Sequence, residues 1–281
     1  MKRSPTPLAA GRRALWSTAA IGALLTTACS DNDVTNPPTF TPDAVVTADQ
    51  LRTALIAAVG NPPYASTDPN YNGGLSLNMW ATVVDRAGVV VAVVFTGPTE
   101  GDQWPGSRVI SAQKANTANN FSLTNLALST ANLYSAVQPG GSLFGLQEAN
   151  PINEDAAFGG NASDYGTTKD YMIGKRIGGT NVFGGGFALY DATGKIVGGL
   201  GVSGDTSCGD HAIGWKVRNA LKLDYVPRDV PVSGDATRPD NIVYDISGGQ
   251  SAGGFGQPHC LNPSAETTVA ASLPPVRQVV P

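Results

Sequence analysis

The stretch GGGFALYDATGKIVGGLGVSG, residues 184–204, says most about the fold of this chain. Its runs FALY and KIVGGLGV contain aromatic and β-branched residues, which favour β-strands. DATG, residues 191–194, stands between them and is typical of a tight turn. The stretch therefore predicts a β-hairpin. The run WATVVDRAGVVVAVVF, residues 80–95, predicts a second hairpin with Gly88 in its turn.

An amphipathic helix is predicted before the hairpin of residues 80–95. Thr47 and Gln50 match a capping box, and Gly60 follows as a stop signal. The apolar face of this helix would be formed by Leu51, Leu55, Ile56 and Val59.

Two more helices are predicted, one after each hairpin. Residues 107–121, SRVISAQKANTANNF, place Lys114 and Thr117 on one helical face. Asp210 is expected to be the N-cap of the last helix. Its apolar face would consist of Ile213, Val217, Ala220 and Leu221.

The composition indicates a globular, loop-rich chain. Of its 281 residues 14% are charged and 41% hydrophobic, with Gly 34 and Pro 20, which excludes a coiled coil and argues against wholesale disorder. Long loops are expected over 122–183 and from residue 227 onward, where NIVYDI (241–246) suggests one strand. Residues 1–28 hold four of the 18 basic residues and no acid, so the remaining chain carries a charge of −8. This charge argues against a nucleic-acid partner.

The amino terminus has the order of an export signal. A basic stretch that ends at Arg13 is followed by an apolar run up to Ala28, so residues 1–28 are expected to be removed. LLTTAC, which ends at Cys29, resembles a lipoprotein cleavage box and predicts lipidation of Cys29, with plain secretion as the alternative. Arg12 and Arg13 leave export by either the general or the twin-arginine route open. Residues 29–46 would form a polar tether on the periplasmic face of a bacterial membrane.

Two cysteines remain after Cys29 is assigned to lipid. In an oxidising compartment Cys208 and Cys260 are expected to form a disulfide. A zinc site is the weaker interpretation, because the two residues lack the usual short spacing of zinc ligands.

The segment GLGVSG matches a dinucleotide-binding fingerprint. Gly199, Gly201 and Gly204 have the required spacing, and Asp224 follows twenty residues on. The region after Asp224 is too loop-rich to complete a doubly wound sheet, so a dinucleotide oxidoreductase is only an alternative. The other interpretation is that the glycines let a helix and a strand approach closely.

The chain contains only two histidines, His211 and His259, so any histidine ligand must be one of them. His211 would follow the expected N-cap, where the helix terminus favours the neutral imidazole that a metal requires. This makes His211 the preferred metal ligand, with a purely structural histidine as the alternative. His259 is adjacent to Cys260, so a disulfide would bring it near Cys208.

Three segments together resemble the haem-binding GlcG/HbpS family. They are ATVVDRAGVVVAVV, ISAQKANTA, and GGGFALYDATGKIVGGLGVSG with Asp210 beyond it. The residues that map onto the family pattern are Lys114, Thr117, Gly201, Ser203, Gly204 and Asp210, whereas His211 and His259 do not map onto it. Phe187 and Ala188 depart from it where the family commonly has an apolar residue and then proline.

The resemblance implies an α+β (α/β) domain, with an antiparallel sheet of about five strands and packed helices, often assembled as oligomers. It also implies haem binding. We therefore expect a HbpS-like domain over 47–226 and a loop-rich extension over 227–281, joined by the cysteine pair. The expected function is an exported haem-binding protein rather than an enzyme, with Lys114 as the cation for the haem propionates. A module of the same fold that has lost its ligand is the first alternative.

Overall fold

The computed structural model describes residues 39–60 and 65–279, all of which belong to one compact unit, Thr35–Pro281. The expected export signal and Cys29 lie outside the described residues. None of the helices in the described ranges has the length and apolar character needed to cross a membrane.

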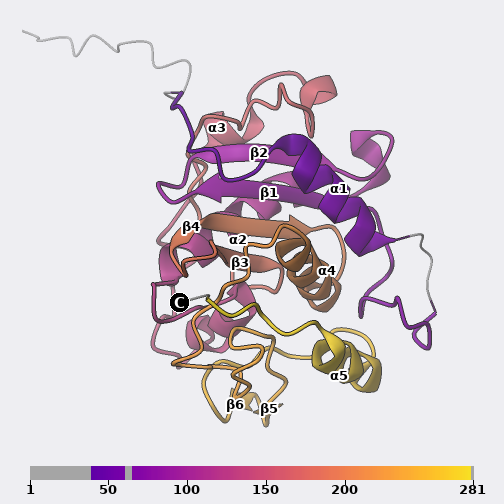
Figure 1. The fold of residues 1–281 in the computed structure, drawn as a ribbon, viewed down its shortest axis with the longest axis vertical. Helices are drawn as coiled ribbons and strands as arrows, with labels where there is room; N and C mark the ends of the chain where they lie inside the picture. The colour runs from indigo at the N-terminus through magenta and orange to yellow at the C-terminus, as the bar shows by residue number, and fades with distance from the viewer. Residues whose placement is uncertain (1–38, 61–64, 280–281) are drawn as a thin grey trace, which may run out of the picture. The chain divides into compact units, whose positions relative to one another are not determined.

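A four-stranded antiparallel sheet forms the centre of this unit (Figure 1). The two predicted hairpins supply it, as β1 (Trp80–Asp85) with β2 (Val90–Phe95) and β3 (Gly186–Tyr190) with β4 (Ile196–Ser203). The strand order is β2-β1-β4-β3, so β1 and β4 are central. The mixed helix and antiparallel-sheet class expected from the sequence is confirmed.

The sheet has four strands instead of about five. At the β3 edge, where one more strand could add, the pairing is a single bridge between Tyr190 and Asp224. Pro227 follows shortly and has no backbone N–H for a ladder. The suggested strand over 241–246 is also reduced, to a short hairpin of β5 (Ile246–Ser247) and β6 (Gln250–Ser251).

Helices cover both faces of the sheet (Figure 1). α1 (Ala48–Val59) and α4 (Ser207–Ala220) pack on one face, where Leu51 and Leu55 of α1 meet Val83 of β1. α2 (Ser107–Phe121) packs on the other face, where Ala112 and Ala115 contact the cluster around Trp80. The first helix begins at the predicted capping box of Thr47 and Gln50, but Ile56 on its expected apolar face is 51% exposed.

Glycines of β4 allow α2 to lie directly on the strand. A Cβ atom on Gly199 would overlap the carbonyl oxygen of Ala115, and one on Gly201 would overlap that of Ser111. GLGVS therefore belongs to a strand covered by a helix, and it is not a phosphate-binding turn between a strand and the helix that follows. The close-approach interpretation of these glycines is confirmed.

The described part of the extension (227–279) packs against the rest of the unit. Besides the small hairpin, it contains α5 (Pro263–Ser272), which begins at Asn262 as N-cap and was not predicted. The loop-rich segment 122–183 contains α3 (Glu154–Phe158) and the short 3-10 turns η2 (Thr130–Leu133), η3 (Ser135–Val137) and η4 (Ala162–Asp164). Another, η1 (Glu100–Asp102), precedes α2.

Candidate functional site

Lys114 and Asp210 form a buried ion pair between α2 and α4. The Lys114 Nζ donates to Asp210 Oδ2 at 2.7 Å and to the Val202 carbonyl oxygen at 3.3 Å. The other carboxylate oxygen of Asp210 accepts the Asp205 N–H at 2.8 Å. Lys114 is only 2% exposed, and its charge is balanced within the chain. Burial raises the pKa of Asp210 to about 7, while Lys114 acts in the opposite direction.

The glycine run Gly184–Gly186 closes over this ion pair. Gly185 has a φ of +115°, and a Cβ atom there would lie 3.2 Å from Lys114 Nζ and 3.0 Å from Asp210 Cβ. A side chain at this position would therefore be both strained and crowded. Within the run, the Gly186 N–H donates to the Thr130 hydroxyl oxygen at 2.8 Å.

The extension covers the glycine run from outside. The Gly184 N–H donates to Gln257 Oε1 at 2.9 Å, and the Gln257 side-chain amide donates to Ser207 Oγ at 2.8 Å. Gln257 is 1% exposed. Close by, Cys208 of α4 and Cys260 of the extension form the expected disulfide, at a sequence separation of 52.

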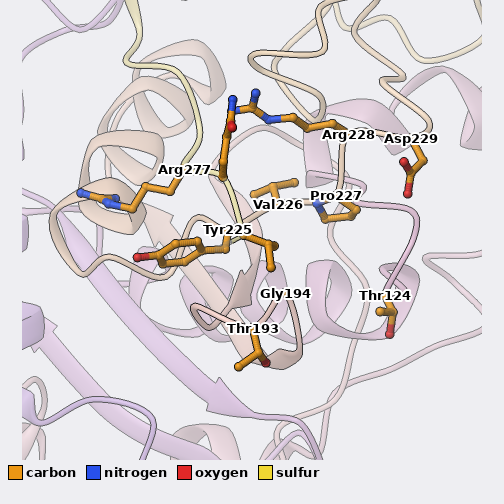
Figure 2. A pocket seen from close by; sticks show the side chains of 11 residues that line it. Thr124, Thr193, Gly194, Tyr225, Val226, Pro227, Arg228, Asp229 and Arg277 are labelled. Atoms are coloured by element: carbon orange, nitrogen blue, oxygen red, sulfur yellow. The ribbon is translucent and has the colours of Figure 1, made fainter. Parts of the chain in front are cut away.

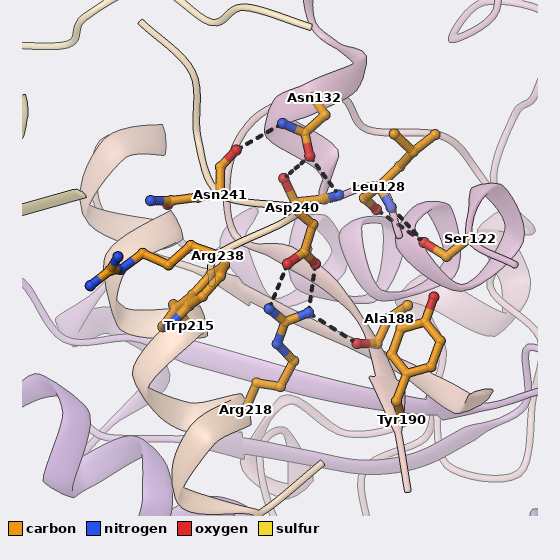
Figure 3. A network of polar contacts seen from close by, with 12 residues as sticks. Ser122, Leu128, Asn132, Ala188, Tyr190, Trp215, Arg218, Arg238, Asp240 and Asn241 are labelled. Carbon is orange, nitrogen blue, oxygen red and sulfur yellow. Dashed lines mark hydrogen bonds and ion pairs between the residues drawn. The ribbon is translucent and has the colours of Figure 1, made fainter. Parts of the chain in front are cut away.

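A second buried ion pair holds the extension to α4 (Figure 3). Asp240 accepts from both terminal nitrogens of Arg218, at 2.6 and 2.8 Å. Arg218 also donates to the Ala188 carbonyl oxygen of β3 at 3.3 Å, and both members of the pair are fully buried. Next to Asp240, the Asn241 carbonyl oxygen accepts from the Asn132 side chain at 2.9 Å.

Thr117 and Ser203 lie outside the ion pair. The Thr117 hydroxyl donates to the Gln113 carbonyl oxygen at 2.8 Å and accepts the Asn181 N–H at 2.9 Å. Ser203 ends β4 opposite Trp80 and is 3% exposed. Of these four candidate site residues, the structure brings only Lys114 and Asp210 into direct contact through their side chains.

His211 is deeply buried in α4. The helix begins at Ser207 with Thr206 as its N-cap, so the predicted N-cap role of Asp210 is wrong and His211 lies in the second turn. The Thr206 side chain accepts the Gly209 N–H, which fixes the earlier start. His211 is 1% exposed, and burial lowers its pKa to about 3.

The surroundings of His211 leave its Nδ1 atom unpaired. The ring centroid lies 4.8 Å from that of Phe187 and 6.2 Å from that of Trp215. Nε2 is 3.1 Å from both Asn241 Oδ1 and the Ile242 nitrogen, whereas Nδ1 is buried with no hydrogen-bond partner among the described residues. In this arrangement a large planar ligand has no access to the ring without displacement of its neighbours.

His259 has a different environment, at the start of the turn that leads into α5. Its Nδ1 lies 2.8 Å from Glu266 Oε2, and its side chain is 30% exposed. The ring stacks on Tyr244 with centroids 4.0 Å apart and planes 14° apart. Burial raises the pKa of the Glu266 carboxylate, but hydrogen bonds from backbone N–H groups and from His259 outweigh it, so the net shift is downward.

The Glu266 contact orients the imidazole of His259. A carboxylate that accepts a hydrogen bond from Nδ1–H fixes the orientation of the ring, which is the arrangement found around metal-binding histidines. Glu266 and Tyr244 were not predicted as site residues. The sequence feature that could have indicated Glu266 is Asn262 followed by Pro263. This pair marks a helix start, which places Glu266 in the first turn of that helix.

Several open pockets on the described part of the chain have the size of small-ligand sites. One of about 530 Å³ lies between the β3–β4 turn and the extension, and Figure 2 shows Arg228 and Arg277 on one side of it and Thr193 and Gly194 on the other. Arg277 is already paired with Asp224. Another pocket, of about 570 Å³, lies against α2 and includes Asn116, Asn120 and Arg176. None of the predicted site residues lines either pocket.

Comparison with known proteins identifies the family. The family model for haem-degrading proteins of the HbpS-like type matches residues 73–217. The chain belongs to the HbpS-like family. Lys114, Thr117, Ser203, Asp210 and His211 therefore lie within the HbpS-like part, and His259, Cys260 and Glu266 lie beyond it.

Several solved structures are similar to the chain at low identity. A crystal structure of PduOC in complex with haem is 22% identical, with a TM-score of 0.40, over 61% of this chain and 89% of that one. The protein ORFY from Klebsiella pneumoniae is 22% identical, with a TM-score of 0.40, over 66% and 92%. A double mutant of HbpS from Streptomyces reticuli is 18% identical, with a TM-score of 0.39, over 76% and 99%. No curated protein matches the chain.

Proposed function

We propose that this protein is an exported protein that binds haem or a related tetrapyrrole. The observation that carries the proposal is the match of residues 73–217 to a family described by haem degradation. The fold agrees with membership, since both hairpins and α2 lie within the matched range. We assign the chain a binding role in this proposal.

His259 is the iron ligand in this proposal. A haem ligand needs an imidazole nitrogen that is unprotonated and accessible, and a partner that fixes the opposite nitrogen. Of the two histidines, His259 fits these conditions better, because its Nδ1 contacts Glu266 and its side chain is 30% exposed. His211, which the sequence favoured, is held in a closed environment at 1% exposure.

In this proposal Lys114 stabilises the fold and does not contact a haem propionate. Its ammonium is paired with Asp210 and covered by the glycine run, so it has no free face for a ligand carboxylate. We assign it the task of joining α2 to α4. Thr117, Ser203 and Asp210 have the same character, since each is buried beneath the surface of the HbpS-like part.

Export and anchoring form part of the proposal. Residues 1–28 would be removed, and Cys29 would carry lipid and hold the protein at the periplasmic face of the membrane. If so, the full-length protein partitions into detergent, and Cys29→Ala releases it into the soluble periplasmic fraction. A wild-type protein found only in the soluble fraction would contradict the anchor but leave the haem proposal intact.

Titration with haemin tests the binding function. The protein from residue 30 onward is titrated with haemin, and the Soret region is followed against a buffer blank. We expect a saturable Soret shift with one haem per chain. A linear, unsaturated change equal to that of a non-binding protein would refute the proposal.

A further inference from the structure

The GGG run over the Lys114–Asp210 pair is held shut by a segment that lies outside the family match. This latch segment comprises residues 256–260, GQPHC. Its Gln257 side chain joins the Gly184 N–H to the Ser207 hydroxyl, and its backbone is fixed by the Gln257 N–H to the Val243 carbonyl oxygen at 2.8 Å. Gly185 and Gly186 are held from below by the Val202 N–H and the Thr130 hydroxyl, whereas the outward cover at Gly184 comes from Gln257.

The latch segment ends at Cys260, which is bonded to Cys208 in the first turn of α4. The disulfide therefore ties the cover directly to the helix that supplies Asp210. The Cys260 sulfur lies 3.2 Å from the Cys208 backbone nitrogen and 3.3 Å from Ser207 Oγ. Hydrogen-bond donors at a helix start stabilise a thiolate, so this sulfur is placed to leave during thiol–disulfide exchange.

We propose that the latch segment is a redox-controlled cover, which a dithiol reductant releases so that the glycine run can open above Lys114 and Asp210. In the exchange, a thiolate of the reductant bonds to one protein sulfur and the Cys208–Cys260 bond breaks. The second thiol of the reductant then resolves the mixed disulfide. The protein gains two electrons and two protons as two thiols, and the reductant becomes a disulfide. The proposal does not depend on haem binding.

Access to the Lys114 amine reports the opening directly. The folded protein, oxidised or treated with dithiothreitol, is reacted briefly with an acetylating ester, and labelling of Lys114 is measured by mass spectrometry relative to the exposed Lys195. We expect labelling of Lys114 to rise at least tenfold on reduction. Amide exchange of β1 and β2, recorded on the same samples, shows that the sheet stays folded.

A variant separates the latch contact from the disulfide. Gln257→Ala, kept oxidised, removes the bridge between Gly184 and Ser207 and is expected to raise Lys114 labelling while the disulfide persists. Gln250→Ala, on the exposed tip of the same extension, is the matched control and should leave labelling unchanged. If Lys114 stays unlabelled in both the reduced protein and Gln257→Ala, the proposal is overturned. It is also overturned if labelling rises only in proportion to lost protection of the whole sheet.

Discussion

At the residue scale, the Glu266 carboxylate contacts both the backbone before α5 and the His259 side chain. It accepts from the backbone N–H groups of Cys260 at 3.0 Å and Asn262 at 2.9 Å, and it also holds His259. Glu266 is 1% exposed, so water cannot take its place as the hydrogen-bond acceptor for these donors. The same side chain thus fixes the turn before α5 and the orientation of the imidazole.

Glu266→Gln is expected to weaken both functions of this carboxylate. A carboxamide presents one N–H group toward backbone donors, so we expect a loss of about 1.5–3 kcal/mol in unfolding free energy, the size of a hydrogen bond to a charged group. Haem affinity should fall about tenfold or more, as for other partners of metal-binding histidines. Urea unfolding and haemin titration measure the two effects. Unchanged haem affinity in a folded variant would remove His259 from the site.

The buried His211 gives the protein a pH dependence with a definite sign. Its pKa falls from 6.5 in the unfolded chain to about 3 in the folded one, so below pH 6.5 only the unfolded chain takes up the proton. The unfolding free energy contributed by neutral His211 is complete above pH 6.5 and is lost as pH falls toward 3, at up to about 1.4 kcal/mol per pH unit.

His211→Gln removes this titration and keeps a polar group near Asn241. Urea unfolding at pH 7 and pH 5 should show a smaller loss of stability in the variant than in the wild type. Equal losses in the two proteins would mean that the folded protein accommodates a charged His211.

Sequence reasoning found several important residues but not the contacts that they make with one another. Lys114 and Asp210 were both singled out, yet they are 96 positions apart, and nothing in the sequence pairs them with each other instead of with a ligand. Glu266 was missed because its role depends on where α5 begins. Buried charges are paired because isolated burial is costly, but the choice of partner is made by tertiary packing.

At the element scale, the helix α2 and the strand β4 are joined by close backbone contact. Gly201 lacks the Cβ atom that would overlap the Ser111 carbonyl oxygen and lie 2.5 Å from the Ala115 nitrogen. Backbone neighbours cannot rotate away as a side chain can. The helix therefore has to shift if the glycine is replaced.

Gly201→Ala is expected to lower the unfolding free energy by about 1–3 kcal/mol, the usual cost of overpacking. Gly106→Ala is the matched control, because its added Cβ would meet nothing within 4 Å and its φ of −62° suits alanine. Thermal unfolding of both variants tests this contact. A stable Gly201→Ala protein would show that α2 does not lie on β4.

The elements themselves were predictable where periodicity and turn chemistry agree. The bounds of α2 match the segment chosen from the sequence, and both hairpins are present. The start of α4 was misplaced because Asp210 is a good N-cap residue in isolation, while Thr206 makes the actual cap. The fifth strand was implied by family resemblance alone, and the structure reduces it to one bridge.

At the scale of the whole molecule, the extension is bonded to the HbpS-like part at several places. Among them are the Arg218–Asp240 ion pair, the Gln257 bridge and the Cys208–Cys260 disulfide. The disulfide could be predicted from cysteine number and compartment. The ion pair could not, because its two residues lie in segments whose packing the sequence does not specify.

Reduction of the disulfide is expected to destabilise the protein without unfolding it at room temperature. The bond closes 52 residues, which corresponds to about 4 kcal/mol in the chain-entropy model. For a chain of this size the melting temperature should fall by roughly 10 °C. Calorimetry with and without reductant measures the change, and thiol titration of the unfolded, unreduced protein from residue 30 onward should find no free thiol. Two titratable thiols in that sample would contradict the bond.

The central claim is that this HbpS-like chain holds haem iron through His259 of its extension. The most direct measurement is the Soret spectrum of the haemin complex for the wild type, His259→Ala and His211→Ala. We expect His259→Ala to shift the band, added imidazole to restore the wild-type spectrum, and His211→Ala to leave the band unchanged wherever it folds. A wild-type spectrum in His259→Ala without imidazole would contradict the account.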